Sequence, residues 1–316
     1  MELQEHAREF AAAGVRVFVV SPEPVAMIAR FTEGTARLLV QCPDRPGIVA
    51  AVSEHLYRRC ANIVQADQYA TGGEVPRFFL RLEYELAVLD ASPAEVADAF
   101  GAGVATRFEI EWHVSYSAIR PRIAILASRS AHCLLDLLWR CRSSELAVDV
   151  AIVISNHETL RTHVEPFDVP YAHLPVTAAT RSQQEQQLLD LLRDRVDLVV
   201  LARYMQVLPP GFLDAYPQAV INIHHSFLPA FAVADPYGQA MTRGVKIIGA
   251  TAHYATPDLD ASPIIEQDVA GVSHRDTRTD LVRHGREIER AVLARPVRWH
   301  LEDRGLVYDN KTVVFR

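Results

Sequence analysis

From residue 122 onward, short runs of apolar residues alternate with longer amphipathic stretches. Residues 123–128 and 197–202 are apolar at nearly every position, as strands buried on both faces of a sheet are. Residues 183–194 instead carry apolar side chains at helical spacing. Strands that alternate with helices predict a mostly parallel sheet with crossover helices, and therefore an α/β fold. The same patterns predict further strands at 149–155, 171–175 and 247–254, helices at 132–139, 160–164, 280–293 and 297–304, and a terminal hairpin at 306–315.

The first part of the chain has a different order of elements. Residues 35–116 predict a small βαββαβ unit, with a first helix that follows the turn Asp44-Arg45-Pro46-Gly47. Asp44 is the expected N-cap of that helix, and Pro46 is allowed in its first turn. Residues 117–121 are the expected linker to an α/β unit at 122–316. The expected strands of the first unit are 37–41, 62–71, 77–86 and 107–116, and its second helix is 93–103.

Residues 1–34 are an N-terminal extension whose role the pattern does not indicate. A helix is expected at 4–13 and a strand at 15–20. Pro22 and Pro24 would end that strand, because proline removes a backbone donor and restricts its neighbours.

Length and composition narrow the class of protein. A chain of 316 residues suits two domains, and 49% hydrophobic with 22% charged residues is ordinary for a globular protein. The net charge of −7 argues against a nucleic-acid or an anionic-membrane partner. Neither a signal peptide nor a membrane span is predicted. The four cysteines are scattered without metal-ligand spacing, which favours reduced thiols, a cytoplasmic location and no metal site.

Candidate chemistry lies in residues 220–229, where an apolar strand runs into Asn222, His224, His225 and Ser226. Alternation places Asn222 and His224 on the same side of the strand. A carboxamide can donate a hydrogen bond to a developing oxyanion, and an imidazole can polarise the same oxygen or donate a proton. The alternative is a strand end whose histidines only satisfy backbone groups. The loop at 257–265 carries two carboxylates after another predicted strand, where α/β sheets place their catalytic groups.

Three motifs in order carry a family resemblance: Asn-Ile-His-His-Ser-Phe-Leu-Pro at 222–229, Gly-Ala-Thr-Ala-His-Tyr at 249–254, and Leu-Asp-x-x-Pro-Ile-Ile at 259–265. They resemble the folate-dependent formyltransferase superfamily. The His-His pair is similar to the formyltetrahydrofolate deformylases, since the transferases usually read Asn-Ile-His-Pro-Ser. The resemblance implies a Rossmann-like formyltransferase-fold domain. It also implies hydrolysis of 10-formyltetrahydrofolate to formate and tetrahydrofolate in one-carbon and purine metabolism.

The turn after the first strand of the α/β unit supports a hydrolase. In the nucleotide-using transferases a Gly-rich turn receives a phosphate there, whereas residues 127–132 of this chain contain no glycine. A turn without glycine is a poor phosphate cradle, which favours an enzyme without a phosphorylated acceptor. Ser130 is the expected cap of the following helix.

The resemblance also implies roles for particular residues. Asn222 would hold the formyl oxygen, His224 would stabilise the oxyanion and return a proton to N10, and Asp260 would orient and deprotonate water. No metal is needed, because the N-formyl group is already activated. His225 is a candidate for positioning water, with solvent-facing or packing roles as the alternative, while Ser226 is expected to be a turn residue and His253 a structural hydrogen-bonder. The folate pocket would be lined on one side by Met205, Gln206, Val207 and Leu208, and on the other by Ala255, Thr256 and Asp258.

A second resemblance concerns the N-terminal unit. Cys-Pro-Asp-Arg-Pro-Gly-Ile-Val at 42–49 is similar to the opening turn of ACT domains, which have a ferredoxin-like fold. Such domains pair between subunits and bind small amino acids, so the resemblance implies a homo-oligomer, either dimer or tetramer, and an amino-acid effector. Asp44, Arg45 and Asn62 are the candidate effector contacts. The alternative is a dimerisation unit without a ligand.

Four residues depart from the deformylase pattern. Val233 and Ser262 stand where the family carries glycine, Asp235 replaces a basic residue, and Gly238 replaces a histidine. A β-branched residue cannot adopt positive φ as glycine does, so the loop at 232–238 is expected to follow another path. Three functions remain open: a deformylase with an altered loop, a folate-dependent transferase that acts on a different acceptor, and a folate- or amino-acid-binding regulatory protein without turnover.

Overall fold

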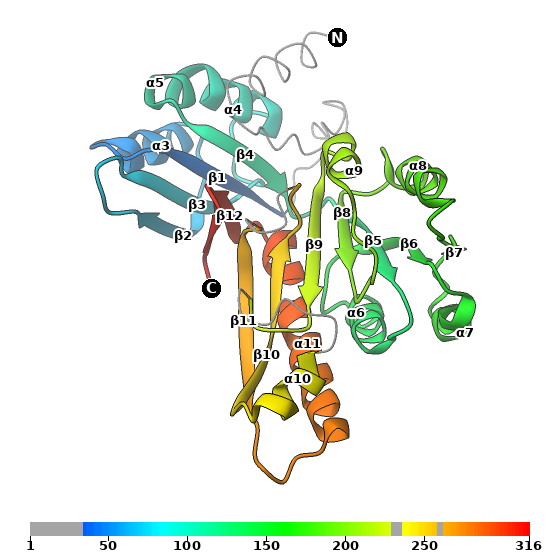
Figure 1. Ribbon diagram of the computed structural model, residues 1–316. Coiled ribbons are helices and arrows are strands. Elements are labelled where there is room, and N and C mark those ends of the chain that lie inside the picture. The colour runs from blue at the N-terminus through cyan, green and yellow to red at the C-terminus, as the bar shows by residue number, and fades with distance from the viewer. Residues whose placement is uncertain (1–33, 229–235, 258–261) are drawn as a thin grey trace.

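The computed structural model describes residues 34–228, 236–257 and 262–316. These residues form two separate sheets and a short terminal hairpin, which Figure 1 shows side by side. The helix predicted at 4–13 and the strand predicted at 15–20 lie outside the described residues. None of the helices in the described part combines the length and apolar character that a membrane crossing requires.

The first sheet has the predicted βαββαβ order. Its four strands are antiparallel and lie in the order β2-β3-β1-β4. Alternate residues of β1 and β3 pack under the two helices in one hydrophobic cluster. The elements are β1 (Thr35–Pro43), α3 (Ile48–Tyr57), β2 (Ile63–Ala70), β3 (Arg77–Glu85), α4 (Pro93–Phe100) and β4 (Glu111–Tyr116).

Two local predictions in this unit are wrong. Asp44 is not the N-cap of α3, because that position belongs to Gly47 at φ 94°, a conformation that glycine adopts easily. The last strand begins at Glu111 rather than at 107, since α4 continues through a π-helical turn (Gly101–Ala105) into α5 (Thr106–Phe108). Glu109 at φ 55° then ends the helix.

The second sheet is mostly parallel, as predicted. Its order is β11-β10-β9-β8-β5-β6-β7. β7, β6, β5, β8 and β9 run parallel, and β10 and β11 are antiparallel additions at one edge. β11 was not predicted. The strands are β5 (Arg122–Ala127), β6 (Asp149–Ser155), β7 (Tyr171–His173), β8 (Leu198–Leu201), β9 (Ala219–His224), β10 (Ile247–Tyr254) and β11 (Ile264–Gly271).

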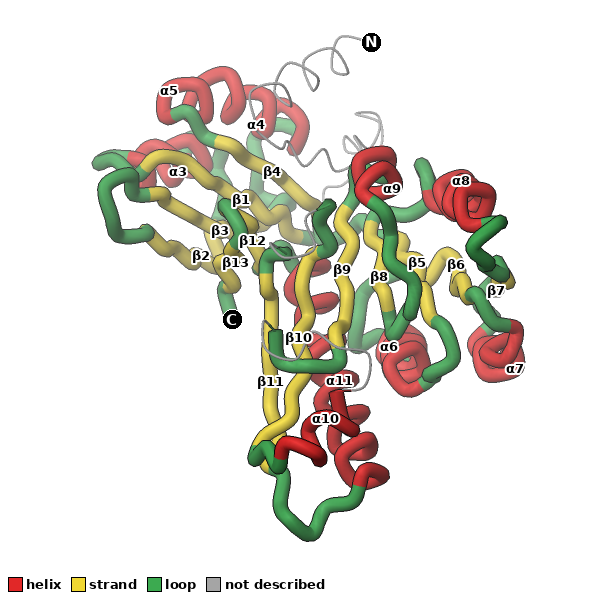
Figure 2. Tube along the Cα trace, viewed as in Figure 1, coloured by secondary structure: helices red, strands yellow, loops and turns green. Residues whose placement is uncertain are grey.

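Helices cover both faces of this sheet, as Figure 2 shows. One hydrophobic cluster joins the sheet to α6 and α11, and another joins its opposite face to α8 and α9. α9 and α10 were not predicted, and Ser130 does not cap α6, whose N-cap is Ala131. The helices are α6 (His132–Arg142), α7 (Arg161–Val164), α8 (Arg181–Leu192), α9 (Pro210–Ala215), α10 (Pro236–Arg243) and α11 (Arg278–Leu301).

α11 is one helix where two were expected. A capping box between Thr277 and Asp280 starts it, and it continues through Pro296. Proline inside a helix costs about 3 kcal/mol. Val292, Leu293 and Val297 are fully buried on either side of Pro296, so packing on the sheet outweighs the lost hydrogen bond.

The C-terminal hairpin, β12 (Gly305–Tyr308) and β13 (Lys311–Val314), is confirmed. It covers the face of the first sheet that α3 and α4 leave open. Phe79 of β3 packs with Val313 and Phe315, and its ring centroid lies 5.0 Å from that of Tyr308. The end of the chain therefore joins the two sheets into one packed unit.

Candidate active site

The candidate site lies where β8 and β9 end and β10 runs past them. Leu201 of β8 and His253 of β10 both pair with Asn222, so the carboxamide lies between two neighbouring strands. Ile221 and Ile223 are buried in the core, whereas Asn222 and His224 are only half-buried on the other face. The predicted alternation is therefore confirmed, and it brings a carboxamide and an imidazole to one side of a strand end.

The Asn222 side chain is held by His253. Asn222 Nδ2 lies 3.1 Å from His253 Nε2, and His253 Nδ1 lies 3.2 Å from the carbonyl oxygen of Tyr254. A carbonyl oxygen only accepts, so Nδ1 carries the proton and Nε2 accepts from Asn222. Burial lowers the pKa of His253, which is consistent with this neutral ring. The second Nδ2 proton of Asn222 is left for another acceptor.

His224 is neutral at ordinary pH. Burial lowers its pKa to about 4, with further lowering by His253 and Arg203 and a smaller opposing effect of Glu289. Its Nε2 is buried and has no hydrogen-bond partner among the described residues. A neutral imidazole can donate one hydrogen bond, so His224 suits the stabilisation of a developing oxyanion without a resting positive charge.

His225 and Ser226 are both buried. The His225 ring stacks on His224 at a centroid distance of 5.3 Å, and its centroid lies 6.5 Å from that of Tyr237. The solvent-facing alternative for His225 is therefore wrong. Thr251 Oγ1 donates to the carbonyl oxygen of Ser226, which fits the expected turn role of this serine.

The predicted pocket residues after β8 are tied to the turn after β5. The backbone N–H of Met205 donates to Ser128 Oγ, which in turn donates to Asn156 Oδ1. Met205 and Val207 are 56% and 58% exposed, so two apolar side chains face solvent at this edge. Exposed apolar side chains at the end of a buried strand are typical of a ligand-binding wall.

Of the other predicted pocket residues, some are described by the structure and some are not. Leu208 is buried and packs in the same cluster as the half-buried Ala255, while Gln206 is half-buried. Thr256 Oγ1 lies 3.4 Å from Ser262 Oγ. Asp258, Asp260, Val233 and Asp235 lie outside the described residues, so the predicted carboxylate of the catalytic trio has no described position.

A buried ionic cluster that was not predicted lies next to His224 and His225. Glu289 of α11 is 1% exposed, and its carboxylate accepts from Tyr237 and His132, each at 2.8 Å. Arg203 Nε lies 3.4 Å from the same carboxylate. Burial alone would raise the pKa of Glu289, but the His132 hydrogen bond, the Arg203 charge and the Tyr237 hydroxyl hold it below its ordinary value.

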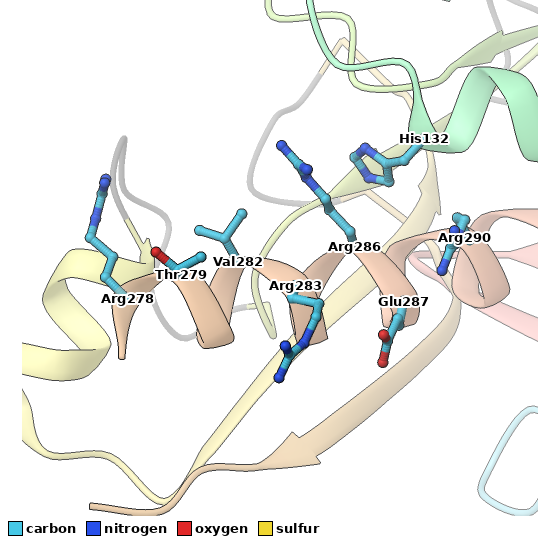
Figure 3. Close-up of a pocket in the computed structure, with 8 residues that line it drawn as sticks. All are labelled: His132, Arg278, Thr279, Val282, Arg283, Arg286, Glu287 and Arg290. Atoms are coloured by element: carbon cyan, nitrogen blue, oxygen red, sulfur yellow. The ribbon is translucent and has the colours of Figure 1, made fainter. Parts of the chain in front are cut away.

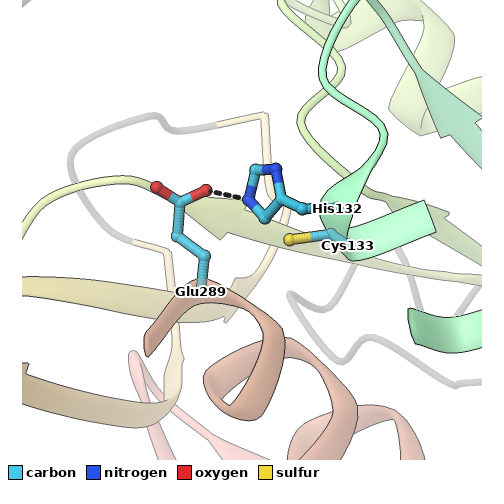
Figure 4. Close-up of side chains that lie close together, drawn as sticks. All are labelled: His132, Cys133 and Glu289. Atoms are coloured by element: carbon cyan, nitrogen blue, oxygen red, sulfur yellow. Dashed lines mark hydrogen bonds and ion pairs between the residues drawn. The ribbon is translucent and has the colours of Figure 1, made fainter. Parts of the chain in front are cut away.

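His132, Cys133 and Glu289 offer ligand atoms within 4.8 Å of one another, and Figure 4 shows them facing each other. Their surroundings do not suit a metal ion. The Arg203 guanidinium already compensates the carboxylate charge. Burial and the nearby Glu289 carboxylate raise the pKa of the Cys133 thiol well above its ordinary value, so the thiolate that a metal requires is disfavoured.

A basic groove of about 510 Å³ runs along the exposed side of α11 (Figure 3). Arg286 and Arg290 lie one turn apart and are exposed, and Arg283 pairs with Asp280 at 3.0 Å. The groove is open, and its charged groups face solvent. Its lining residues are His132, Arg278, Thr279, Val282, Arg283, Arg286, Glu287 and Arg290.

Comparisons with known proteins agree on one family. The formyl transferase family model matches residues 121–297. The chain is 54% identical to a formyltetrahydrofolate deformylase of Mycobacterium tuberculosis over 279 residues, covering 88% of this chain and 90% of that protein. The chain belongs to the formyltetrahydrofolate deformylase family.

Among solved structures, a deformylase matches more of this chain than a transformylase does. The structure of a formyltetrahydrofolate deformylase from Pseudomonas syringae matches with a TM-score of 0.86 and 48% identity, covering 91% of this chain and 96% of that one. Glycinamide ribonucleotide transformylase 1 from Symbiobacterium toebii matches with a TM-score of 0.59 and 31% identity, covering 64% of this chain and 97% of that one. The deformylase match therefore includes both sheets, in agreement with the resemblance of the Asn-Ile-His-His motif.

Proposed function

We propose that this chain hydrolyses 10-formyltetrahydrofolate to formate and tetrahydrofolate, with water as the formyl acceptor, in one-carbon and purine metabolism. Membership of the formyltetrahydrofolate deformylase family supports the reaction. The single observation that supports the site is the Asn222 carboxamide, held by His253 beside the neutral His224. The apolar wall of Met205 and Val207 supports a folate pocket next to it.

In the proposed mechanism the water oxygen attacks the formyl carbon and the carbonyl electrons move to the oxygen. Asn222 donates its second Nδ2 proton to this oxyanion, and such a donor contributes about 3–4 kcal/mol. Asp260 takes the proton of the water, and the neutral His224 ring helps return this proton to N10, donating one proton as it accepts the other while the carbon–nitrogen bond breaks. General acid–base catalysis of this kind contributes about 10²–10⁴ in rate. The products are formate and tetrahydrofolate.

Release of formate and tetrahydrofolate by the purified protein tests the proposal. We expect Asp260→Ala and Asn222→Ala to lower kcat by about 10²-fold or more while folate still binds. Arg58→Gln, at the exposed residue that follows α3, is the control and should keep full activity. Folate binding without formate release in the unmodified protein would overturn the proposal. Transfer of the formyl group to an amine acceptor would then favour the transferase. Folate binding without any transfer would favour the regulatory protein.

We further propose the division into an extension at 1–34, an ACT domain at 35–116, a linker at 117–121 and a catalytic domain at 122–316. A pocket of about 550 Å³ at the turn into α3 supports an amino-acid effector site on the ACT domain. Asp44 and Arg45 line this pocket, whereas Asn62 is not among its lining residues and donates to Glu85. The free cysteines Cys42, Cys60, Cys133 and Cys141 fit the proposed cytoplasmic location.

The effector proposal is tested by the shift in melting temperature with each common amino acid. At least one small amino acid should raise the melting temperature of the unmodified protein but not of Arg45→Gln. Light scattering during gel filtration measures whether the proposed homo-oligomer, a dimer or tetramer, exists. If no amino acid shifts the melting temperature and the oligomer is intact, the N-terminal unit would be a dimerisation unit without a ligand.

A further inference from the structure

Arg203 carries a buried charge that is only partly satisfied. Its side chain is 15% exposed, and neither Nε nor Nη1 has a hydrogen-bond partner among the described residues. The Glu289 carboxylate approaches Nε at 3.4 Å without forming a hydrogen bond. Buried donors without partners are rare in native proteins, and each one requires an explanation such as a catalytic or binding role.

Arg203 lies near the proposed catalytic residues. Arg203 lies two residues after Leu201, and His224 lies two residues after Asn222, the residue that pairs with Leu201. His224 is the last residue of β9, Arg203 follows the end of the neighbouring β8, and the Arg203 charge acts on His224. His224 Nε2 is also buried without a partner among the described residues. Two unsatisfied nitrogens, one of them cationic, lie on adjacent strand ends.

The Arg203 backbone is unusual as well. Its φ is 66°, in the left-handed region that residues other than glycine rarely adopt. Its carbonyl oxygen accepts from the N–H of Ser128 at 3.2 Å, which fixes this strand end to the turn after β5. Strained residues of this kind cluster at ligand-binding and active sites.

We propose that Arg203 binds the carboxylate of the product formate beside His224, and that Glu289 weakens this binding enough for formate to leave. The proposal rests on the function proposed above. A guanidinium matches a carboxylate in shape and charge, and Nη1 is free to donate. An unopposed buried cation would retain the anion, whereas the Glu289 carboxylate 3.4 Å away offsets part of the charge.

Formate binding is measured directly by the line broadening of [¹³C]formate, and formate is then used as a product inhibitor. Arg203→Gln should raise the dissociation constant of formate at least tenfold, and Arg203→Lys should raise it less. Arg203→Gly removes the side chain and relieves the positive φ, and its melting temperature is measured beside formate binding, so that a fold defect is distinguished from a lost carboxylate site. Glu289→Gln should act in the opposite direction and lower the constant at least threefold.

Two controls make the result specific. Arg286→Gln removes an exposed arginine from α11 and should leave formate binding unchanged. Tetrahydrofolate binding should stay within twofold in all Arg203 variants, because the carboxylate position is separate from the pterin wall. Unchanged formate binding in Arg203→Gln would overturn the proposal. Weaker formate binding in Glu289→Gln, or a parallel loss of tetrahydrofolate binding in the Arg203 variants, would also overturn it.

The binding measurement needs no turnover, so the two proposals fail separately. Formate binding that depends on Arg203 without hydrolysis would contradict only the function. If the protein hydrolyses the substrate but formate binding does not depend on Arg203, only the role assigned to Arg203 would be contradicted.

Discussion

At the scale of single residues, the charge of His224 determines how the site works. Its folded pKa of about 4 lies below the ordinary histidine value of 6.5 because of burial, His253 and Arg203. Protonation therefore requires a pH near 4. The unfolded chain binds this proton first, so His224 lowers the stability of the fold only as the pH falls below 6.5.

We therefore predict that protonation of His224 causes no decline of kcat/KM between pH 7.5 and 5.5. Direct evidence would come from the imidazole carbon resonance of His224 across pH 8 to 4, assigned by its absence in His224→Gln. The resonance should shift only near the lower end of this range. A midpoint near 6.5 would show that the ring is solvated and would contradict the buried, neutral His224 described above.

The residues of the site differ in how far the sequence reveals them. Strict alternation with Ile221 and Ile223 identifies Asn222 and His224 as one face of a strand, because that signal is local. Glu289 gives no such signal, since an acid on an amphipathic helix normally faces solvent. Its burial depends on Arg203 and His132, which lie far away in the sequence. Long-range charge compensation is not visible in the local pattern.

At the scale of elements, α11 and α10 meet closely at one glycine. Gly285 of α11 lies against the Tyr237 ring, and an added Cβ would fall only 2.8 Å from the ring carbon Cε1 and closer still to the hydroxyl. Tyr237 donates to Glu289 one turn further along α11. The missing side chain at Gly285 therefore allows the hydroxyl to reach the buried carboxylate.

We predict that Gly285→Ala destabilises the protein although alanine favours helix. Overpacking costs about 1–3 kcal/mol, against a helix gain of about 1 kcal/mol. Urea unfolding measures the free energy, and kcat should fall because Tyr237 moves from Glu289 and His225. The matched control is Gly211→Ala in α9, where an added Cβ meets nothing within 4 Å. Equal stability of both variants would show that α10 moves away from the added methyl group without a cost in stability.

Elements with continuous apolar runs, such as β8, follow from the sequence because burial on both faces leaves a local signal. β11 was missed because acidic and polar residues interrupt it. Glu266 is buried in β11, where Arg295 of α11 at 3.6 Å and Arg316 at 3.4 Å compensate its charge. The missed strand and the missed Glu289 have the same cause, a buried acid that is compensated by a distant arginine.

At the scale of the whole molecule, α11 links the two sheets. Its middle carries Glu289, and its end is held by the first sheet through arginines of β1 and β3. Arg37 Nη1 donates to the carbonyl oxygen of Leu301 at 3.2 Å, and Arg81 Nη2 donates to that of Glu302 at 3.1 Å. Arg81 is 1% exposed and also pairs with Glu83 and Asp67. The hairpin then covers the same face of β3.

We predict that Arg81→Met costs about 1–3 kcal/mol, because it leaves the carbonyl oxygen of Glu302 without its donor and removes one partner of the half-buried Glu83 carboxylate. Hydrogen exchange should become faster at residues 298–303, where the helix loses its hold on the first sheet, more than at β5 or β8. Arg58→Met is the matched control, since its ion pair with Glu54 is exposed and is worth about 1 kcal/mol or less. Faster exchange spread evenly over both sheets would mean that Arg81 stabilises the whole fold rather than this junction. Exchange that stays local would instead make the end of α11 the point through which a ligand on the first sheet could act on Glu289 and His224.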